Sequence, residues 1–482
     1  MRKRNPPRPA EVSITSLSKK GNGIGVVEGE TERFVEVPFS MPGDKLRILM
    51  HRKRSGVYGS SLEEILTPSP DRVEARCVHF AMCGGCRWQH IPYAKQLEIK
   101  QELITKLFLP HIVPGLSIDS IIPCDPPWEY RNKMEFTFSS DAAGKHYLGL
   151  IIDGSRGKVL NLTECHLTHP WFIDALKATR QWWGETNLAA YHPHSNKGSL
   201  RTLTVRESLR TGDRLIMLTV SGNADYALQK QHLESLTAFL RDAAEPLTPG
   251  SQLSIFLRIQ QIAKGTATNF YEILLYGPDH IDERLTIKPA ANEEATSLTF
   301  AVSPSAFFQP NTRQAEKLYS RALQLLDIRK GCVVYDLYCG TGTLGICVAQ
   351  HAKQVIGIEI SPESSLDART NAAANGLKNV TILTGSVRDV ITRIRQEQSH
   401  LLPDIVMVDP PRIGLDEETI KHLIDLNPEK ILYISCNPTT QAENIVALKA
   451  AGYQITAIQP VDQFPHTVHI ENIVVLKRNV VC

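Results

Sequence analysis

Apolar and polar residues alternate in short runs over the first part of the chain, from about residue 10 to residue 68. Gly, Pro and Asp separate these runs, as expected where short strands are joined by tight turns. Short strands at this spacing predict a small β-barrel. The runs read GNGIGVVEG, RFVEVPF, DKLRILM and GVYGSSLEEIL.

The middle of the chain mixes helical and strand periodicities. Apolar residues recur at helical spacing from Tyr93 to Phe108, where Leu97, Ile104 and Leu107 lie on similar faces. Strand-like runs follow, on either side of a second helical segment. The pattern predicts an α+β region but not the order of its strands. The strand-like runs are WEYRNKMEFTF, HYLGLIID, DRLIMLTV and FYEILLYG, and the helical segment is LQKQHLESLTAFL.

After about residue 300, apolar strands alternate with segments of helical length. This alternation predicts a parallel sheet with ligands at the carboxyl ends of the strands. The whole pattern therefore predicts a multidomain chain, with a barrel at residues 1–72, an α+β domain at 73–298 and a Rossmann-like α/β domain at 299–482. The strand segments of the last domain are CVVYDLYCGTGTLGI, QVIGIEI, NVTILTG, DIVMVDPPR and KILYISCNP.

Composition changes this picture little. Of the 482 residues, 42% are hydrophobic and 22% are charged, close to the average of globular proteins. The chain has no run of about 18 apolar residues that could span a bilayer. No apolar segment follows the basic start MRKRNPPRPA, so a secretory signal is not expected. A cytoplasmic protein without a membrane partner is therefore expected.

Although the net charge is only +2, two clusters of basic residues lie near the N-terminus. Local positive charge attracts phosphate backbones, and OB-type barrels often bind nucleic acids. A solvated, disordered arm is an equally good interpretation of the first cluster. The clusters are Arg2, Lys3, Arg4 and Arg8, and HRKRSG at His51–Gly56.

Ten cysteines in a cytosolic chain indicate metal binding or catalysis rather than disulfides. Cys77, Cys83 and Cys86 lie close together in the sequence, and Cys165 is isolated. Four thiolates suit either a [4Fe–4S] cluster or structural zinc, and one trio with a distant fourth cysteine favours the iron–sulfur cluster. A redox role and a structural role both remain open. Inert packing is expected for Cys124, Cys332, Cys339, Cys347 and Cys482.

A glycine-rich turn follows the first strand of the C-terminal domain, in Asp336–Thr343. Gly340 and Gly342 allow the backbone to approach a ligand closely, just before a helix N-terminus. The turn does not match a dinucleotide motif, and no phosphate-binding Lys follows it. Glu359 ends the next strand, where an acid suits the two hydroxyls of a ribose. A helix cap is the alternative role for Asp336.

This arrangement resembles the S-adenosylmethionine pocket of class I methyltransferases. The resemblance implies that Asp336 to Gly342 hold the methionine end of the cofactor and that Glu359 holds the ribose. It also implies that Ser386 or Asp389 approaches the adenine. Asp409 begins D-P-P, which resembles the signature of methyltransferases acting on planar nitrogen bases, although diprolines also form ordinary turns.

A lone thiol, Cys436, ends the fifth strand in LYISCNPTT. It is expected on the same rim as Gly340 and Glu359, the rim being the edge of the sheet formed by the carboxyl ends of the parallel strands. A thiolate suits a target carbon that is too electron-poor to attack a methyl group. Addition of a thiolate to C6 of uracil makes C5 nucleophilic, and a base must later remove the C5 proton. Glu471 is the candidate base, with His466 and His469 nearby in the sequence. A packed, inert cysteine is the alternative.

Five motifs in order resemble the RNA uracil-5-methyltransferase family: F-x-Q-x-N, D-x-x-C-G-x-G, D-P-P-R-x-G, S-C-N-P and H-x-E. The resemblance covers the C-terminal domain and implies that Cys436 is the nucleophile and Glu471 the proton-abstracting base. The residues implied at cofactor positions are Gln309, Tyr338, Thr343, Glu359, Ser386 and Asp409.

The spacing of Cys77, Cys83, Cys86 and Cys165 resembles the [4Fe–4S] site of the 23S ribosomal RNA branch of this family, and the barrel resembles that branch's TRAM domain. The transfer RNA branch, by resemblance, lacks both features. The family also shares the Y-R-N-K element, which implies RNA contacts by Arg131 and Lys133, although a half-buried edge strand would look similar. Phe307 or Phe308 could stack on a base.

These observations predict a monomeric enzyme that uses S-adenosylmethionine to methylate C5 of a uridine in 23S ribosomal RNA. The target base is expected to be flipped out of its stack. One alternative is the same chemistry on transfer RNA. A second is base N-methylation through Asp409, Pro410 and Pro411. A third is a non-catalytic RNA-binding redox sensor built around an iron–sulfur cluster.

Overall fold

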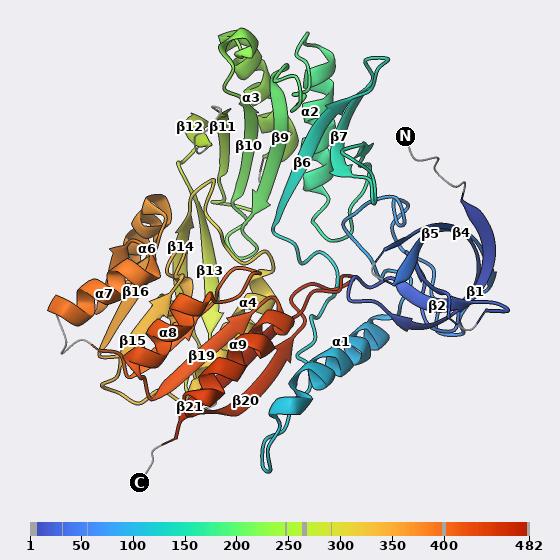
Figure 1. Cartoon of the computed structure of the whole chain (residues 1–482). Coiled ribbons are helices and arrows are strands. Elements are labelled where there is room, and N and C mark those ends of the chain that lie inside the picture. The colour runs from blue at the N-terminus through green and yellow to red at the C-terminus, as the bar shows by residue number, and fades with distance from the viewer. Residues whose placement is uncertain are drawn as a thin grey trace.

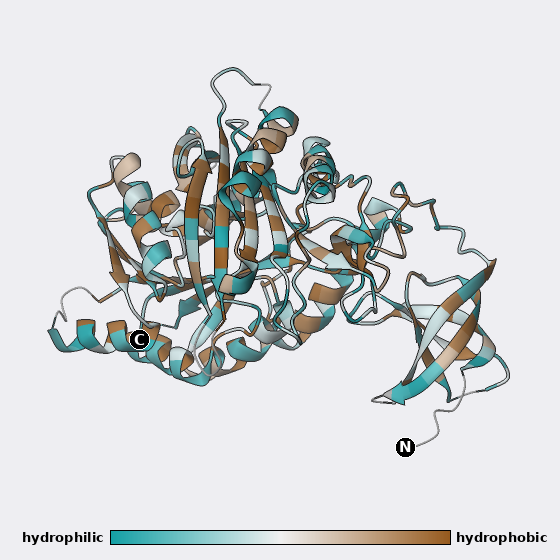
Figure 2. Ribbon diagram, turned by 90° about the horizontal axis from the view of Figure 1, so that it is seen from above, coloured by the Kyte–Doolittle hydropathy of each residue, from teal (hydrophilic) through white to brown (hydrophobic). Residues whose placement is uncertain are grey.

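The computed structural model describes residues 7–30, 32–54, 56–245, 248–262, 268–290, 292–397 and 402–479. The N-terminal barrel lies to one side of two larger regions, each built on a seven-stranded sheet (Figure 1). The apolar strands of these sheets lie in the interior (Figure 2). The predicted basic residues Arg2, Lys3 and Arg4 and the cysteine Cys482 lie outside the described residues.

Five strands close into the N-terminal barrel, in the order β1-β2-β3-β5-β4. Alternation places one side chain in two inside the barrel, so Val12, Ile14, Leu46 and Ile48 are at most 2% exposed. The predicted barrel is confirmed, and its first strand includes Arg8. The strands are β1 (Arg8–Leu17), β2 (Gly23–Val27), β3 (Phe34–Val37), β4 (Lys45–Arg54) and β5 (Val57–Thr67).

Helix α1 (Tyr93–Phe108) matches the predicted helix, but it packs against the C-terminal sheet rather than the central one (Figure 1). Ile104 and Phe108 belong to the core of that sheet. Lys100 Nζ lies 2.6 Å from Asp462 Oδ1, and both side chains are fully buried. Helix α1 lies within the predicted domain 73–298 by sequence but packs in the core of the C-terminal sheet. The predicted domain boundaries therefore stay a prediction. A short 3₁₀ helix, η1 (Leu109–His111), follows α1.

The central sheet has the order β12-β11-β10-β9-β6-β7-β8, and only β10 and β11 pair in parallel. Helices α2 and α3 cover one face, around the buried rings of Phe136, Trp182 and Trp183. Strand β12 forms one edge. The elements are β6 (Lys133–Ser140), β7 (His146–Ile151), β8 (Val159–Asn161), α2 (Trp171–Gly184), β9 (Leu200–Glu207), β10 (Arg214–Ser221), η2 (Ala224–Tyr226), α3 (Lys230–Ala244), β11 (Leu253–Gln261) and β12 (Asn269–Tyr276).

A hairpin of β13 (Ile281–Ile287) and β14 (Thr296–Val302) packs in the same core as the C-terminal domain. That domain's sheet has the order β17-β16-β15-β18-β19-β21-β20, with the first five strands parallel. The predicted α/β class of this domain is confirmed. Its elements are α4 (Thr312–Leu326), β15 (Val333–Leu337), α5 (Thr343–Val348), η3 (Ala349–His351), β16 (Gln354–Glu359), α6 (Pro362–Ala374), β17 (Val380–Thr384), α7 (Val387–Glu397), β18 (Ile405–Val408), α8 (Glu417–Leu426), β19 (Lys430–Ser435), α9 (Pro438–Ala450), β20 (Tyr453–Val461) and β21 (Glu471–Arg478).

Strand β21 runs antiparallel to β19, and Asn472 pairs with Ser435. The first residue of an antiparallel strand lies at the edge where the parallel strands end. Glu471 therefore reaches the rim where Cys436 leaves β19. In the part of the chain that the structure describes, no helix has the length and apolar character needed to cross a membrane.

Candidate active site

The turn after β15 contains three residues with positive φ: Tyr338 at 63°, Gly340 at 54° and Gly342 at 78°. A Cβ on Gly342 would lie 3.1 Å from Cβ of Ala368, so the turn needs glycine there for space as well as conformation. The backbone of Tyr338 is left-handed although this residue is not glycine. Such a conformation costs free energy and is typical of functional loops. The backbone N–H of Gly340 donates to Glu359 Oε2 at 3.0 Å. The glycine turn and Glu359 therefore lie together, as predicted.

Asp336 is buried beneath this turn, and its Oδ2 accepts a hydrogen bond from the Gly345 N–H at 2.8 Å. Burial raises the pKa of Asp336 to about 7, with further increases from Asp409 and Glu359, while the Gly345 N–H opposes the shift. Burial also raises the pKa of Asp409 to about 7. The rim is thus a group of crowded carboxyls, a chemistry that suits a positively charged ligand.

Glu359 has both carboxylate oxygens bonded to backbone, since Oε1 accepts from the Ser361 N–H at 2.8 Å. Each oxygen keeps a second lone pair, so the carboxylate can still accept from the hydroxyls of a ribose. The Gly385 N–H donates to the Glu359 carbonyl at 2.9 Å and brings the loop with Ser386 alongside. The Ser386 hydroxyl itself donates to Asp389 Oδ2 at 2.7 Å.

Other predicted cofactor residues are held by neighbouring side chains. The Thr343 hydroxyl lies 3.0 Å from that of Thr341. The Tyr338 hydroxyl is directed to α8, where it lies 3.1 Å from the Thr419 hydroxyl. Gln309 is buried and bonded to the Tyr319 hydroxyl, whose pKa is raised by burial and by the Asp409 carboxylate. Tyr319 thus links Gln309 to the rim.

Cys436 leaves β19 at a turn that is held from both sides. The Asn437 N–H donates to the Ser435 hydroxyl at 3.1 Å, and the Asn437 side chain donates to the Arg412 carbonyl at 2.9 Å. Burial raises the pKa of the Cys436 thiol to about 11, and Glu471 and Asp409 add to this shift. The Arg412 guanidinium opposes it through its charge and a hydrogen bond to the sulfur.

Glu471 is only 4% exposed, and burial together with Asp409 raises its pKa well above the ordinary value, while Arg412 opposes the shift. His469 Nε2 lies 3.4 Å from the Arg412 guanidinium, and burial and Arg412 lower the pKa of His469 to about 4. His466 faces elsewhere, because its ring stacks on Trp128 at 3.8 Å. The structure thus brings Cys436, Glu471 and Asp409 together around Arg412.

Sequence reasoning gave no role to Arg412, Tyr319 or Gln463. Arg412 was visible in the D-P-P-R motif, so its position after the fourth strand was the available signal. Tyr319 lies in an ordinary amphipathic helix, and Gln463, which donates to Gln309 Oε1 at 3.2 Å, lies in a loop. Neither carried a local signal.

The predicted RNA-binding residues differ in exposure. Phe307 is 67% exposed, whereas the adjacent Phe308 is buried. Arg131 lies near enough to His469 to help lower its pKa. Lys133 begins β6 and is half-buried, and burial together with Arg206 lowers its pKa to about 8. The predicted strand therefore starts after Arg131, and the RNA contacts stay a prediction.

The four cysteines predicted to bind a metal lie in one neighbourhood. Burial raises the pKa of Cys77 to about 11 and that of Cys86 to about 12, and the nearby thiolates of this group, including Cys165, contribute to both shifts. Burial also raises the pKa of Cys83, again with a contribution from Cys165. Within the described ranges, however, no three His, Cys, Asp or Glu side chains meet closely enough to hold a metal ion. Four thiolates are suitable ligands for an iron–sulfur cluster, but the four sulfur atoms are not close enough together to form a complete metal site.

The sheet order, the glycine turn after β15 and the acid at the end of β16 define a class I methyltransferase, the class that uses S-adenosylmethionine. A family model described as tRNA (Uracil-5-)-methyltransferase matches residues 241–479. The chain belongs to this family of RNA uracil-5-methyltransferases.

Similar proteins span nearly the whole chain. An uncharacterised RNA methyltransferase of Protochlamydia amoebophila is 57% identical over 442 residues, which cover 92% of this chain and 99% of the relative. One from Clostridium tetani is 34% identical and covers 97% of both chains. The structure of Pyrococcus abyssi tRNA (uracil-54, C5)-methyltransferase in complex with S-adenosyl-L-homocysteine matches with a TM-score of 0.71 and 24% identity, covering 97% of this chain and all of that one. The two proteins share one fold.

Proposed function

We propose that this protein methylates C5 of one specific uridine in 23S ribosomal RNA, with Cys436 as nucleophile and Glu471 as proton-abstracting base. The observation that carries the proposal is the pairing of β19 with β21, which brings these two residues to the same edge of the sheet. The Arg412 guanidinium lies near both and stabilises the negative form of each. A packed, inert cysteine would need neither neighbour.

S-adenosylmethionine, when bound, supplies an electrophilic methyl group on a positively charged sulfur. The crowded carboxyls of Asp336, Asp409 and Glu359 favour such a cation. Gly340 and Gly342 let the backbone approach the methionine end, and Glu359 accepts from the ribose hydroxyls. Gln309, Tyr338, Thr343 and Ser386 complete the proposed pocket.

The proposed reaction begins with a uridine flipped out of its stack, because a paired base could not reach the rim. The Cys436 thiolate adds to C6 and the electron pair moves to O4, so that C5 attacks the methyl group. Glu471 then takes the C5 proton, and the electrons of that C–H bond re-form the C5–C6 double bond and expel the thiolate. The products are 5-methyluridine, S-adenosylhomocysteine, which keeps the electron pair of the broken sulfur–methyl bond, and the regenerated thiolate, with the proton on Glu471.

Arg412 has a defined task in this scheme. Its guanidinium is hydrogen-bonded to the Cys436 sulfur and lies near the Glu471 carboxyl. One cation therefore favours the ionised form of both groups that must ionise during the reaction. The Asn437 amide, bonded to the Arg412 carbonyl, keeps the two loops in register.

The choice of RNA rests on resemblance. The barrel and the four cysteines together resemble the ribosomal RNA branch. Transfer RNA is the second candidate, because the Pyrococcus structure named for a tRNA substrate covers 97% of this chain, and the barrel therefore does not separate the two. Arg131, Lys133 and Phe307 would contact the RNA beside the site, and the protein would act as a monomer in the cytoplasm.

We also propose that Cys77, Cys83, Cys86 and Cys165 bind a [4Fe–4S] cluster, whose four iron–thiolate bonds would link residues 77–86 to Cys165. Cys165 packs against one apolar cluster with Cys83 and against another with Cys86, and this shared packing supports the assignment. The adjacent Arg87 and Trp88 N–H groups donate to the His466 carbonyl, five residues before Glu471. A structural role is therefore favoured over electron transfer. Anaerobic purification should give about four iron atoms per chain, and Cys86→Ser should abolish their visible absorption.

The decisive experiment maps 5-methyluridine in ribosomal and transfer RNA from cells with and without the gene. We expect one ribosomal site to lose its methyl group when the gene is absent and to regain it with the wild-type protein. Cys436→Ala should not restore it, and RNA carrying 5-fluorouridine should crosslink only to proteins that retain Cys436. Methylation by Cys436→Ala would contradict the C5 mechanism, and a loss confined to transfer RNA would reassign the substrate.

A further inference from the structure

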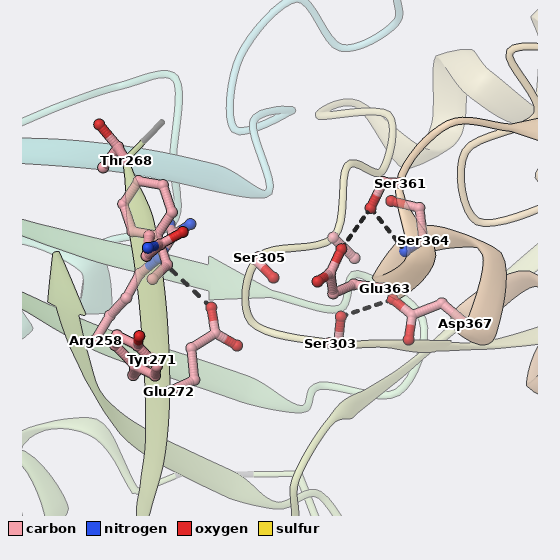
Figure 3. Close-up of a pocket in the computed structure, with 13 residues that line it drawn as sticks. Arg258, Thr268, Tyr271, Glu272, Ser303, Ser305, Ser361, Glu363, Ser364 and Asp367 are labelled. Atoms are coloured by element: carbon pink, nitrogen blue, oxygen red, sulfur yellow. Dashed lines mark hydrogen bonds and ion pairs between the residues drawn. The ribbon is translucent and has the colours of Figure 1, made fainter. Parts of the chain in front are cut away.

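A cavity of about 640 Å³ lies between the edge of the central sheet and the C-terminal domain. Figure 3 shows Arg258, Tyr271 and Glu272 on one side, and Ser361, Glu363, Ser364 and Asp367 on the other, with Ser305 between them. Its volume is in the range of sites that hold a molecule of nucleoside size. No residue of this cavity was predicted to bind cofactor, metal or RNA.

The first wall is strand β12, which presents flat aromatic surface to solvent. Phe270 is 44% exposed and Tyr271 is 53% exposed, which is unusual for rings on a sheet edge. The Arg258 guanidinium lies 3.8 Å from the centre of the Phe270 ring, and its Nε lies 3.6 Å from Glu272 Oε1. Exposed rings with a guanidinium are the common means of stacking unpaired bases.

The second wall consists of hydroxyls and carboxylates. The Ser303 hydroxyl donates to Asp367 Oδ2 at 2.6 Å, and the Ser361 hydroxyl donates to Glu363 Oε2 at 2.9 Å. Glu272, on the first wall, is hydrogen-bonded to Ser305. Glu272, Glu363 and Asp367 oppose a single guanidinium in the lining, so the cavity accepts hydrogen bonds and disfavours phosphate.

The cavity borders the proposed cofactor site. The segment 303–306 that lines it continues directly to Gln309. Ser361, on the other side, donates its N–H to the Glu359 carboxylate at 2.8 Å. A molecule in the cavity would therefore lie beside the proposed cofactor site, on the same side of the C-terminal domain as Glu359.

We propose that this cavity binds a second, unstacked nucleotide of the substrate RNA, whose base carries an amino group. The base stacks on Phe270, which lies on the same face of the strand as Glu272, and its amino group donates to the carboxylates of Glu272 and Asp367. Uridine is disfavoured, since it has no amino group and its Watson–Crick edge offers one N–H flanked by two carbonyl oxygens, which the carboxylates repel. The inference rests on the proposed function and adds a specificity site to it.

The test is a cycle of protein and RNA changes. A synthetic RNA fragment that the full-length wild-type protein methylates is made with a single abasic nucleotide at each position near the target. Phe270→Ala should raise the KM for the intact fragment about tenfold, the scale of one lost stacking contact, with kcat and the KM for S-adenosylmethionine unchanged. At one position the abasic change should raise the RNA KM of the wild type about tenfold, and it should leave the RNA KM of the Phe270→Ala variant unchanged.

Two variants control for folding and for the strand itself. Phe270→Leu keeps the apolar volume without the flat ring and should behave like Phe270→Ala. Ile273→Ala is the matched control, because Ile273 is 45% exposed on the same strand but does not line the cavity. Uridine at the RNA position identified by the abasic scan should raise the KM of the wild type. Glu272→Gln should reduce this increase, because the amide can donate to a uracil carbonyl.

The outcomes separate the two proposals. If the wild type transfers no methyl group to uridine in any RNA, the proposed function fails. If it does so and abasic changes are additive with Phe270→Ala at every position, the second-nucleotide site alone is wrong. An equal loss in Ile273→Ala would also overturn it, since it would point to a protein partner along the edge of β12 or to a general effect of the strand.

Discussion

At the scale of single residues, the reactivity of Cys436 depends on a balance of charges. Burial and two carboxyls raise the pKa of its thiol to about 11, and Arg412 acts in the opposite direction. Below this pKa only a small fraction of the sulfur is thiolate, the nucleophilic form. The free protein therefore holds a mostly protonated thiol at neutral pH.

The rate of Cys436 alkylation by iodoacetamide should consequently rise about tenfold for each pH unit between pH 7 and pH 10 and level off near pH 11. The measurement is mass spectrometry of the peptide that contains Cys436. A plateau near pH 7 would show that the thiol is already ionised in the free protein.

Replacement of Arg412 by Gln should move that alkylation profile to higher pH, because the cation that favours the thiolate is lost. Arg412→Lys retains the charge and should restore part of the reactivity. The neighbouring exposed residue Ile413 provides a matched control as Ile413→Ala. An unchanged profile in Arg412→Gln would remove Arg412 from the proposed mechanism.

Glu471→Gln should stop the reaction after methyl transfer, since the C5 proton can no longer be removed. Turnover should fall at least a hundredfold, the usual scale for a missing general base. A covalent protein–RNA complex should accumulate on unmodified RNA and resist denaturing electrophoresis. The double variant with Cys436→Ala should form none, and free turnover by Glu471→Gln would assign the proton to another base.

At the scale of elements, helix α1 holds the loop that leads to Glu471. The Lys100 ammonium on α1 donates to Asp462 at 2.6 Å and to the Phe464 carbonyl at 3.1 Å. The Tyr93 hydroxyl donates to the other oxygen of Asp462 at 2.8 Å. This buried group ties residues 93–100 to the segment between β20 and β21.

Lys100→Met should therefore lower stability by about 3–5 kcal/mol, because it leaves the Asp462 carboxylate buried without its cation. The measurement is the melting temperature, which should fall by several degrees. Lys95→Met, on the same helix and in an exposed pair with Glu98, should leave it unchanged. Equal melting temperatures would show that α1 docks through its apolar face alone.

At the scale of the whole molecule, the barrel carries exposed positive charge away from the catalytic rim. Arg52 and Lys53 lie exposed near the end of β4. Arg52→Ala with Lys53→Ala should weaken RNA binding and reduce the slope of log K against log salt by about 1.4–1.8. Filter binding at several potassium concentrations measures this, and an unchanged slope would leave the barrel without phosphate contacts there.

The sequence by itself determined which elements form and which residues end them. Periodicity located helix α1 and the parallel strands, and a strand must end before Pro438, two residues after Cys436, so the thiol had to lie at a rim. These are local properties, because backbone geometry depends on residues a few positions apart. Alternation also marks β13 and β14 as strands, but neither it nor the periodicity of α1 indicates which core these elements join.

Only the tertiary structure decided which of these residues meet. Glu471 is 35 positions from Cys436 by number, and it reaches the sulfur because β21 inserts antiparallel beside β19. Lys100 meets Asp462 across 362 positions, and Phe270 of β12 lies across a cavity from hydroxyls at the start of α6. Pairings of this kind depend on the burial of whole faces of sheets and helices, a property of the packed molecule that no short stretch of sequence contains.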